Sequence, residues 1–409
     1  MPWKETRPMD ERVTFIVESL RGELSMSELC RKYEISRKTG YKWVERFEEG
    51  GRPSLADRSR ACLTHPNAIG EEIVRLVVDA RKRHPTWGPI KLLYELEQRY
   101  PRLKKNLPSC STIGAILKRQ GLIRPRRGRR TAAPYTAPFV GCDGPNTVWC
   151  ADFKGSFALG NGKRCHPLTI SDAYSRYLLR CEGMSRTELG YVRPIFESAF
   201  CEFGRPVAIR TDNGPPFATV AAGGLSALAI WWIKLGIRPE RIAPGKPQQN
   251  GRHERMHRTL KQDAIKPPSR TLAEQQLRFD RFRRVYNDER PHQALGMQPP
   301  ATVYDTSSRA YPVKLREPEY PTCFSVRSVN HKGMLKWKGE MIYIAETLAN
   351  EHVAVEEIAD EEWRVYFADV ALGVIEDGRF RRAKLSWPAR GQRPENQKTG
   401  HTVSPMCPV

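Results

Sequence analysis

The sequence predicts a multidomain protein with all-α N-terminal modules, an α/β core and a small C-terminal β-barrel. Apolar residues recur at helical spacing up to about residue 122, strand-like and helical segments alternate from 147 to 287, and short β-like runs fill 320–382. The 409 residues carry 68 Lys and Arg against 46 Asp and Glu, a net charge of +22. This excess lies within residues 1–300, because residues 301–409 hold 15 basic and 15 acidic side chains. The charge favours a polyanionic partner such as nucleic acid.

Several protein classes are excluded by what the chain lacks. No apolar run approaches the ~18–20 residues of a membrane span, and the start of the chain has no apolar stretch of the signal-peptide kind. Its ten cysteines form no Cys-x-x-Cys pair, which favours reduced thiols over disulfides or a zinc knuckle. We therefore expect a cytoplasmic protein with no membrane partner.

Residues 1–50 are expected to form a helix-turn-helix domain of three short helices. Ser25-Met26-Ser27-Glu28 offers a capping box, and Ser36 caps a third helix from Arg37 to about Phe47. If its apolar side chains pack inward, four basic residues face out: Arg37, Lys38, Lys42 and Arg46. This layout is typical of a recognition helix that enters a major groove. An ordinary helical bundle with a solvated basic face is the alternative.

A linker at 51–67, rich in Gly, Pro, Ser and Arg, leads to a second helical DNA-binding domain at 68–122. Its helices are expected at 71–83, after Trp87-Gly88-Pro89, and from Ser109 to Gly121. Residues 123–140 are expected to form an extended basic arm that contacts phosphates or a minor groove, or else a merely solvated linker. Five arginines lie at its start: Arg124, Arg126, Arg127, Arg129 and Arg130.

The α/β core is expected at 141–305, with an early antiparallel meander and later helices. Strands are expected at 147–153, 166–171, 177–181 and 206–210, an extended segment at 237–242, and helices at 187–202, 225–235, 250–264 and 271–287. Gly160-Asn161-Gly162 is expected to be a hairpin turn, and Trp231 and Trp232 to be core residues. The small β-barrel should occupy 315–385, followed by a disordered tail at 386–409.

Three carboxylates occupy distinctive positions in this core. Asp152 ends the first strand, Asp212 directly follows the strand at 206–210, and Glu254 lies early in the helix at 250–264. Strand ends and a helix start can converge at one edge of a sheet. Clustered carboxylates repel one another, and a divalent cation relieves this. Oxygen ligands favour Mg²⁺ or Mn²⁺, and a pair of such ions can stabilise both oxygens of an in-line displacement at phosphorus.

Five motifs resemble the DDE transposases of bacterial insertion sequences and, through them, the catalytic core of retroviral integrases. They are Trp149-x-x-Asp152, Asp172-Ala173-Tyr174-Ser175-Arg176, Thr211-Asp212-Asn213-Gly214, the run from Gly245 to Arg255 (GKPQQNGRHER), and Tyr286-Asn287-Asp288-x-Arg290-Pro291-His292. The resemblance covers residues 10–305. Helix-turn-helix elements replace the N-terminal zinc module of integrases. The longer spacing between Asp212 and Glu254 fits the extra segment Gly223-Gly224-Leu225-Ser226.

The resemblance implies a ribonuclease-H-like fold whose metal-binding triad is Asp152, Asp212 and Glu254. It implies a transposase that binds the terminal inverted repeats, cleaves the DNA ends with two Mg²⁺ ions, for which Mn²⁺ can substitute, and joins the 3′-OH to target DNA. The partners are then double-stranded DNA, as transposon ends and target, and at least one further copy of the chain. The expected location is the bacterial cytoplasm, associated with the nucleoid.

The helix at 250–264 carries further candidates. Glu254, His257, Arg258 and Lys261 recur at helical spacing and are expected to share one face, while Met256 and Leu260 dock on the sheet. DNA contacts are expected from Gln249, Asn250, Arg258 and Lys261. His253 is either a further contact or a helix-start residue without a chemical role.

Two other functions remain as alternatives. His253-Glu254-Arg255-Met256-His257 also matches the zinc-protease pattern HExxH, in which both histidines bind zinc and Glu254 acts as general base. The extended form of that pattern fails, because Leu260 and Asp263 occupy its last two marked places. The other alternative is a catalytically inactive DNA-binding regulator, which the two basic modules would also suit.

Overall fold

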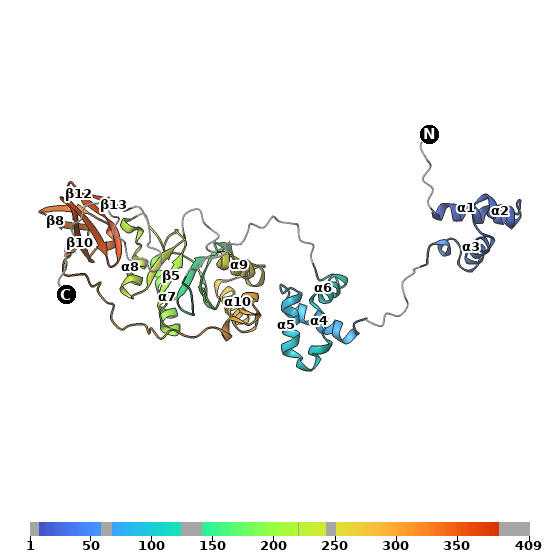
Figure 1. The fold of residues 1–409 in the computed structure, drawn as a ribbon, viewed down its shortest axis with the longest axis horizontal. Coiled ribbons are helices and arrows are strands. Elements are labelled where there is room, and N and C mark those ends of the chain that lie inside the picture. The colour runs from blue at the N-terminus through green and yellow to red at the C-terminus, as the bar shows by residue number, and fades with distance from the viewer. Residues whose placement is uncertain (1–7, 59–67, 124–140, 220, 243–250, 384–409) are drawn as a thin grey trace, which may run out of the picture. The chain divides into compact units, whose positions relative to one another are not determined.

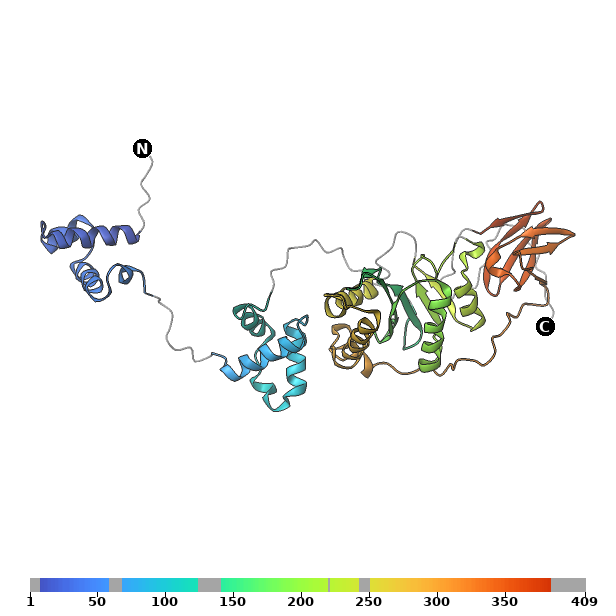
Figure 2. The same ribbon diagram turned by 180° about the vertical axis from the view of Figure 1, so that it is seen from behind.

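A computed structural model describes residues 8–58, 68–123, 141–219, 221–242 and 251–383 (Figures 1 and 2). The chain divides into two compact units, Met1–Gly70 and Glu71–Val409. The arginine arm and both Gln249 and Asn250 therefore lie outside the described residues, as does the expected tail.

The first unit is a three-helix module. It comprises α1 (Pro8–Arg21), α2 (Met26–Lys32), α3 (Arg37–Gly50) and a 3-10 turn, η1 (Arg52–Leu55). Both expected caps are confirmed: Ser25 and Glu28 form a capping box, and the Ser36 side chain accepts a hydrogen bond from Thr39 N. Gly40 permits close packing of α2 and α3, because a Cβ there would lie 2.5 Å from Cys30 Sγ.

The second unit begins with another helical module. It comprises α4 (Glu71–Arg83), α5 (Pro89–Arg99), the 3-10 turn η2 (Pro101–Asn106) and α6 (Cys110–Arg119). The Ser109 side chain caps α6 by accepting a hydrogen bond from Thr112 N, which places the helix start one residue after the predicted one. The helices enclose a small core of fully buried aliphatic side chains: Val77, Leu92, Leu96, Ile113, Ile116 and Leu117.

A six-stranded mixed sheet forms the centre of the second unit. Its strands are β1 (Val148–Phe153), β2 (Phe157–Ala158), β3 (Arg164–Asp172), β4 (Leu178–Met184), β5 (Ala208–Thr211) and β6 (Arg238–Arg241). β3 pairs antiparallel with β1, β2 and β4, whereas β1, β5 and β6 run parallel. The expected Gly-Asn-Gly turn connects β2 to β3. This is the ribonuclease-H-like topology that the motifs implied.

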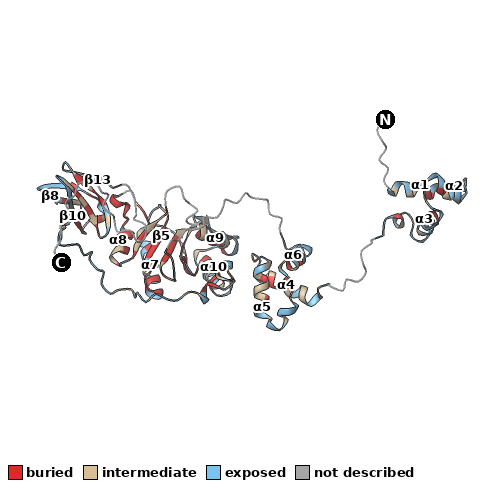
Figure 3. Cartoon of the chain, viewed as in Figure 1, coloured by how far each residue is buried: buried red, intermediate tan, exposed pale blue. Residues whose placement is uncertain are grey.

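Helices cover both faces of this sheet. One face packs on α7 (Leu189–Phe203) and α8 (Ala227–Lys234), through a cluster that includes the buried Trp231 and Trp232. The other face packs on α9 (Gly251–Leu260) and α10 (Leu272–Arg284), each of which ends in a π-helical turn, Lys261–Ile265 and Val285–Glu289. Buried residues accordingly follow the central strands and the inner sides of the helices (Figure 3).

The C-terminal region is the small β-structure that the sequence predicts, although its strands do not close into a barrel within the described residues. β7 (Ser325–Ser328), β10 (His352–Ala359), β11 (Glu362–Phe367), β12 (Val370–Glu376) and β13 (Arg379–Arg382) form an open antiparallel sheet, and β8 (Met334–Trp337) and β9 (Glu340–Tyr343) form a separate hairpin. β13 is a short edge strand with exposed arginines, a composition that opposes further pairing. Sequence alternation predicted the strands but not their closure.

The apolar face of the five-stranded sheet packs both on the β8–β9 hairpin, through Leu335 and Ile342, and on the α/β core. Ala222, Leu225, Ala229 and Ile230 join the same cluster as the inward side chains of β10, β11 and β12. Gly223 has φ +59°, and a Cβ there would lie 2.9 Å from a methyl group of Leu372 in β12. The segment that lengthens the spacing between Asp212 and Glu254 therefore supplies the docking surface of the C-terminal sheet.

Among the described residues no helix has the length and apolar character needed to cross a membrane. The eight cysteines in that part of the chain are all free thiols, as the sequence predicted.

Candidate functional site

The site begins with the alternation of side chains along β1 and β3. Trp149 and Ala151 belong to the cluster under α7, so Asp152 points to the opposite face, where α9 packs. On β3, Leu168 and Ile170 likewise face α7. Thr169, which pairs across the ladder with Asp152, therefore shares that residue's face. Polar side chains at alternate positions thus gather beneath α9.

The register of the parallel strands relates Asp152 to Asp212. Val148 pairs with Ala208, Trp149 with Ile209 and Cys150 with Arg210. Continuing this offset brings Asp212, the residue directly after β5, opposite Asp152. Neighbouring strands lie about 4.8 Å apart, and residues in register point to the same face. Both carboxylates are half-buried.

Helix α9 docks through a stripe that the sequence analysis divided wrongly. The buried residues are His253, Met256, His257 and Leu260, at spacings of three, one and three. His257 was expected on the outward face with Glu254, and His253 was expected at the DNA or without a role. Both are instead only 3–4% exposed. The spacing of the four residues is that of one helix face, but two of them are histidines, which are polar and were therefore not predicted to be buried.

A single hydroxyl connects this helix to the sheet. Thr169, fully buried, donates from Oγ1 to the Asp152 carbonyl oxygen at 3.1 Å, and the same atom lies 2.6 Å from His253 Nε2 and 2.7 Å from His257 Nε2. His253 Nδ1 lies 3.2 Å from Ser171 Oγ. Sequence analysis missed Thr169. Its signal is the Leu-Thr-Ile-Ser alternation of β3, which places two hydroxyls on one face.

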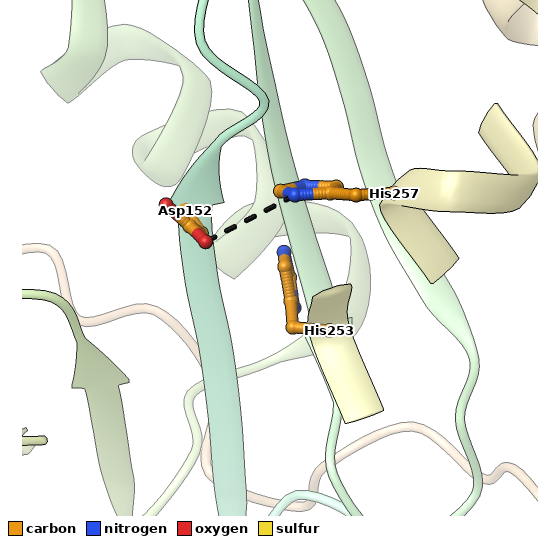
Figure 4. Close-up of side chains that lie close together, drawn as sticks. All are labelled: Asp152, His253 and His257. Atoms are coloured by element: carbon orange, nitrogen blue, oxygen red, sulfur yellow. Dashed lines mark ion pairs between the residues drawn. The ribbon is translucent and has the colours of Figure 1, made fainter. Parts of the chain in front are cut away.

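Asp152 completes a compact cluster with the two histidines (Figure 4). Its Oδ2 lies 3.9 Å from His257 Nδ1, and one ligating atom of each of the three residues lies within 4.8 Å of the others. Burial lowers the pKa of His253 to about 3 and also lowers the pKa of His257, with help from the neighbouring His253. Both imidazoles are therefore neutral at pH 7.

The other two expected metal ligands, Asp212 and Glu254, are not members of this cluster. Glu254 is exposed, one residue from His253 on the first turn of α9. Asp212 accepts a hydrogen bond from Gly214 N at 3.2 Å, which shapes the turn after β5. The structure thus brings Asp152 together with two histidines, and the triad of Asp152, Asp212 and Glu254 stays a prediction.

The expected DNA-contacting residues that the structure describes lie at the surface. Arg37, Lys38 and Lys42 are exposed on α3, and the Arg46 guanidinium stacks 5.0 Å from the centre of the buried Trp43 ring. Arg258 at the C-terminal end of α9 and Lys261 in the π-helical turn that follows are exposed.

Two motif residues have structural roles. Asn287 uses its amide to bond both the N–H and the C=O of Leu178, at 2.8 and 3.0 Å, and so fixes the start of β4 on α10. Asp172 accepts hydrogen bonds from Ser175 N and Oγ and from Asn146 N, although burial raises its pKa. Their chemistry is satisfied within the fold, so neither is a candidate metal ligand.

Comparison with known families agrees with this geometry. Two models described as the integrase core domain match residues 143–247 and 235–300, which contain Asp152, Asp212 and Glu254. Residues 143–300 therefore match the integrase core domain. A helix-turn-helix domain model matches residues 11–61, and a homeodomain-like domain model matches 39–117.

Curated relatives of this integrase-core chain include proteins of bacterial insertion elements. It is 28% identical to the uncharacterized 39.2 kDa protein of insertion element IS476 from Xanthomonas euvesicatoria, over 60% of this chain and 69% of the relative. It is 30% identical to the uncharacterized 31.7 kDa protein of insertion element IS407 from Burkholderia multivorans, over 46% of this chain and 66% of the relative. It is also 30% identical to the Gag-Pol polyprotein of koala retrovirus, over 30% and 7%.

Solved structures of viral integrases are more distant. The HTLV-2 integrase catalytic core domain in complex with magnesium is 15% identical, with a TM-score of 0.32, over 40% of this chain and 98% of that chain. The simian T-cell lymphotropic virus intasome in complex with PP2A regulatory subunit B56 gamma is 14% identical, with a TM-score of 0.34, over 72% and 97%.

Proposed function

We propose that this chain is an insertion-sequence transposase. It binds the terminal inverted repeats of its element, hydrolyses a phosphodiester bond at each end to leave a 3′-OH, and joins that hydroxyl to target DNA by transesterification. The observation that carries the proposal is the strand register. Its offset, continued two residues beyond Cys150 and Arg210, brings Asp212 opposite Asp152 on the face where the helix that bears Glu254 packs. This is the placement that two-metal phosphoryl chemistry needs.

The carboxylates suit hard divalent ions. Asp152 and Asp212 offer half-buried oxygens on the same face, and Glu254 is free to turn toward them because its side chain is exposed. In the proposed arrangement Asp152, Asp212 and Glu254 would together hold two Mg²⁺ ions. Bound there, the ions would supply a deprotonated nucleophile and charge neutralisation at the scissile phosphate.

The protein's own groups then hold and orient the DNA. Arg258 in α9 and Lys261 in the π-helical turn that follows lie one and two turns beyond Glu254, and both are exposed, so they can receive the phosphates that flank the cleaved bond. The α3 residues of the first unit are assigned to the inverted repeat. Joining two ends at one target requires at least two copies of the chain.

The zinc-protease alternative gains one observation from the structure, because His253 and His257 do lie together with a carboxylate. The alternative predicts peptide hydrolysis, whereas the proposed function predicts DNA cleavage supported by Mg²⁺. The inactive-regulator alternative predicts that the folded chain binds the repeats but does not cleave them.

One assay separates the proposed function from both alternatives. Duplexes that carry the repeats flanking the gene are incubated with the full chain and Mg²⁺, and 3′-end cleavage is followed on a sequencing gel. We expect cleavage by the native protein and none by Asp212→Asn, with repeat binding unchanged in a gel-shift assay. Cleavage that survives Asp212→Asn would overturn the proposal, as would binding without cleavage in the native protein.

A further inference from the structure

The donors and acceptors around Thr169 determine the tautomers of both buried histidines. The hydroxyl has one proton, and the Asp152 carbonyl oxygen at 3.1 Å can only accept it. When that proton goes to the Asp152 carbonyl oxygen, the contacts of 2.6 and 2.7 Å are donated to Thr169 by the Nε2–H groups of His253 and His257. Neutral imidazoles with a proton on Nε2 have a lone pair on Nδ1.

For His253 this lone pair has a donor, because the Ser171 hydroxyl lies 3.2 Å from Nδ1. For His257 the lone pair faces an acceptor instead. Its Nδ1 lies 3.9 Å from Asp152 Oδ2, in a site where the two side chains are 6% and 15% exposed. A divalent cation placed between these two atoms would be bound by both, because a carboxylate oxygen and an imidazole lone pair are each metal ligands.

The spacing fits a metal ion with bonds of about 2.0–2.2 Å. In tetrahedral coordination, ligand atoms at that bond length lie about 3.3–3.5 Å apart. The 3.9 Å between Asp152 Oδ2 and His257 Nδ1 exceeds this by only about half an ångström, and the third ligating atom, from His253, lies within 4.8 Å. Small side-chain rotations close these distances.

The surrounding hydroxyls can orient the ligands. When His257 binds through Nδ1, its Nε2–H still donates to Thr169, the arrangement that commonly orients a metal-bound imidazole. His253 reaches the ion by releasing Thr169, and its other ring nitrogen stays within hydrogen-bonding distance of Ser171. Two imidazoles and one carboxylate are a ligand set for Zn²⁺-like ions, whereas Mg²⁺ prefers oxygen alone.

We propose that Asp152, His253 and His257 form a site for one divalent transition-metal ion of the Zn²⁺ class. Occupancy takes Asp152 away from the Mg²⁺ ions. The site is therefore inhibitory, a consequence that rests on the proposed function, whereas the binding itself does not. The chain would then be switched between two metal states through one shared carboxylate.

Co²⁺ is the probe, because its visible absorption reports a low-coordinate site directly. Titration of the full chain should give one equivalent of intense visible absorption that Zn²⁺ displaces. His257→Gln and, separately, His253→Gln should abolish it, and Thr169→Val should weaken the affinity by about 10–100-fold. Asp212→Asn is the matched control, since Asp212 lies outside the cluster, and it should bind Co²⁺ normally. Thermal unfolding of each variant identifies any that has lost its fold. If one histidine variant fails to fold, the other is enough to test the proposal.

The proposal is overturned if the native chain shows no such absorption, or if a folded histidine variant binds Co²⁺ as tightly as the native chain. Near-ultraviolet absorption typical of Co²⁺–thiolate bonds would also overturn it, because that identifies cysteine ligands. In the cleavage assay, Zn²⁺ added to Mg²⁺ should inhibit the native chain, and a transition-metal chelator should restore activity. Cleavage by Asp212→Asn would refute the transposase function but leave the Co²⁺ result standing.

Discussion

Replacing Thr169 by valine tests the hydrogen-bonded connection between helix α9 and the sheet. Valine has nearly the same shape as threonine, so the change removes one hydroxyl and leaves the packing in place. The hydroxyl is fully buried and is the partner of the Nε2 atoms of both His253 and His257. The variant therefore strands two imidazole N–H groups where water does not reach.

A buried donor without a partner costs about 1–3 kcal/mol, and the added methyl group returns part of that. We expect Thr169→Val to lower the free energy of unfolding of the core by about 2–4 kcal/mol. Thr169→Ser is the matched control. It keeps the hydroxyl and deletes one buried methyl group, which costs about 0.5–1.5 kcal/mol.

Differential scanning calorimetry of the full chain measures both variants, with attention to the transition of the α/β core. A domain of this size shifts its Tm by roughly 2–4 °C per kcal/mol, so Thr169→Val should lower the core Tm by roughly 4–16 °C, and by more than Thr169→Ser. Equal decreases in Tm for the two variants would refute the reasoning, because they would mean that the Thr169 hydroxyl does not stabilise the packing of α9.

Three further predictions follow from buried contacts. Burial lowers the pKa of both His253 and His257, so below about pH 6.5 the unfolded chain binds protons that the folded chain does not. The free energy of unfolding should therefore fall between pH 6.5 and 3, by about 2 kcal/mol per histidine at pH 5. The variant with both histidines changed to glutamine should show a shallower acid dependence in urea titrations. Asn287→Ala leaves the N–H and C=O of Leu178 unpaired and should cost about 2–4 kcal/mol in the same titrations; a loss below about 0.5 kcal/mol would contradict its role. Gly223→Val places a side chain against β12 at a positive φ, so limited proteolysis should release the C-terminal sheet faster than from the native chain; an unchanged rate would argue against that docking surface.

Local structure could be predicted where one short signal decides it. Ser25, Ser36 and Ser109 cap helices because each serine precedes an apolar helical repeat. Strand-like segments around Trp149 and Ile209 likewise located the central sheet, in which these two residues pair across parallel strands. These features depend on neighbours in the sequence or on a single ladder.

Contacts between residues that are far apart in the sequence could not be predicted from such local signals. The orientation of α9 depends on Thr169, more than eighty residues away in sequence, and on histidines that are buried because a hydroxyl satisfies them. The barrel was predicted from strand count, but closure depends on whether β13 finds a partner and on the core surface around Gly223. No pattern within either segment encodes those partners.

The most direct test of the account concerns Glu254, the one triad member that is exposed. Glu254→Gln should abolish Mg²⁺-dependent 3′-end cleavage of the repeat duplex while leaving repeat binding and the core Tm unchanged. Glu357→Gln, an equally exposed change on β10, should cleave like the native chain. Full cleavage by Glu254→Gln would contradict the assignment of Asp152, Asp212 and Glu254 as the catalytic carboxylates.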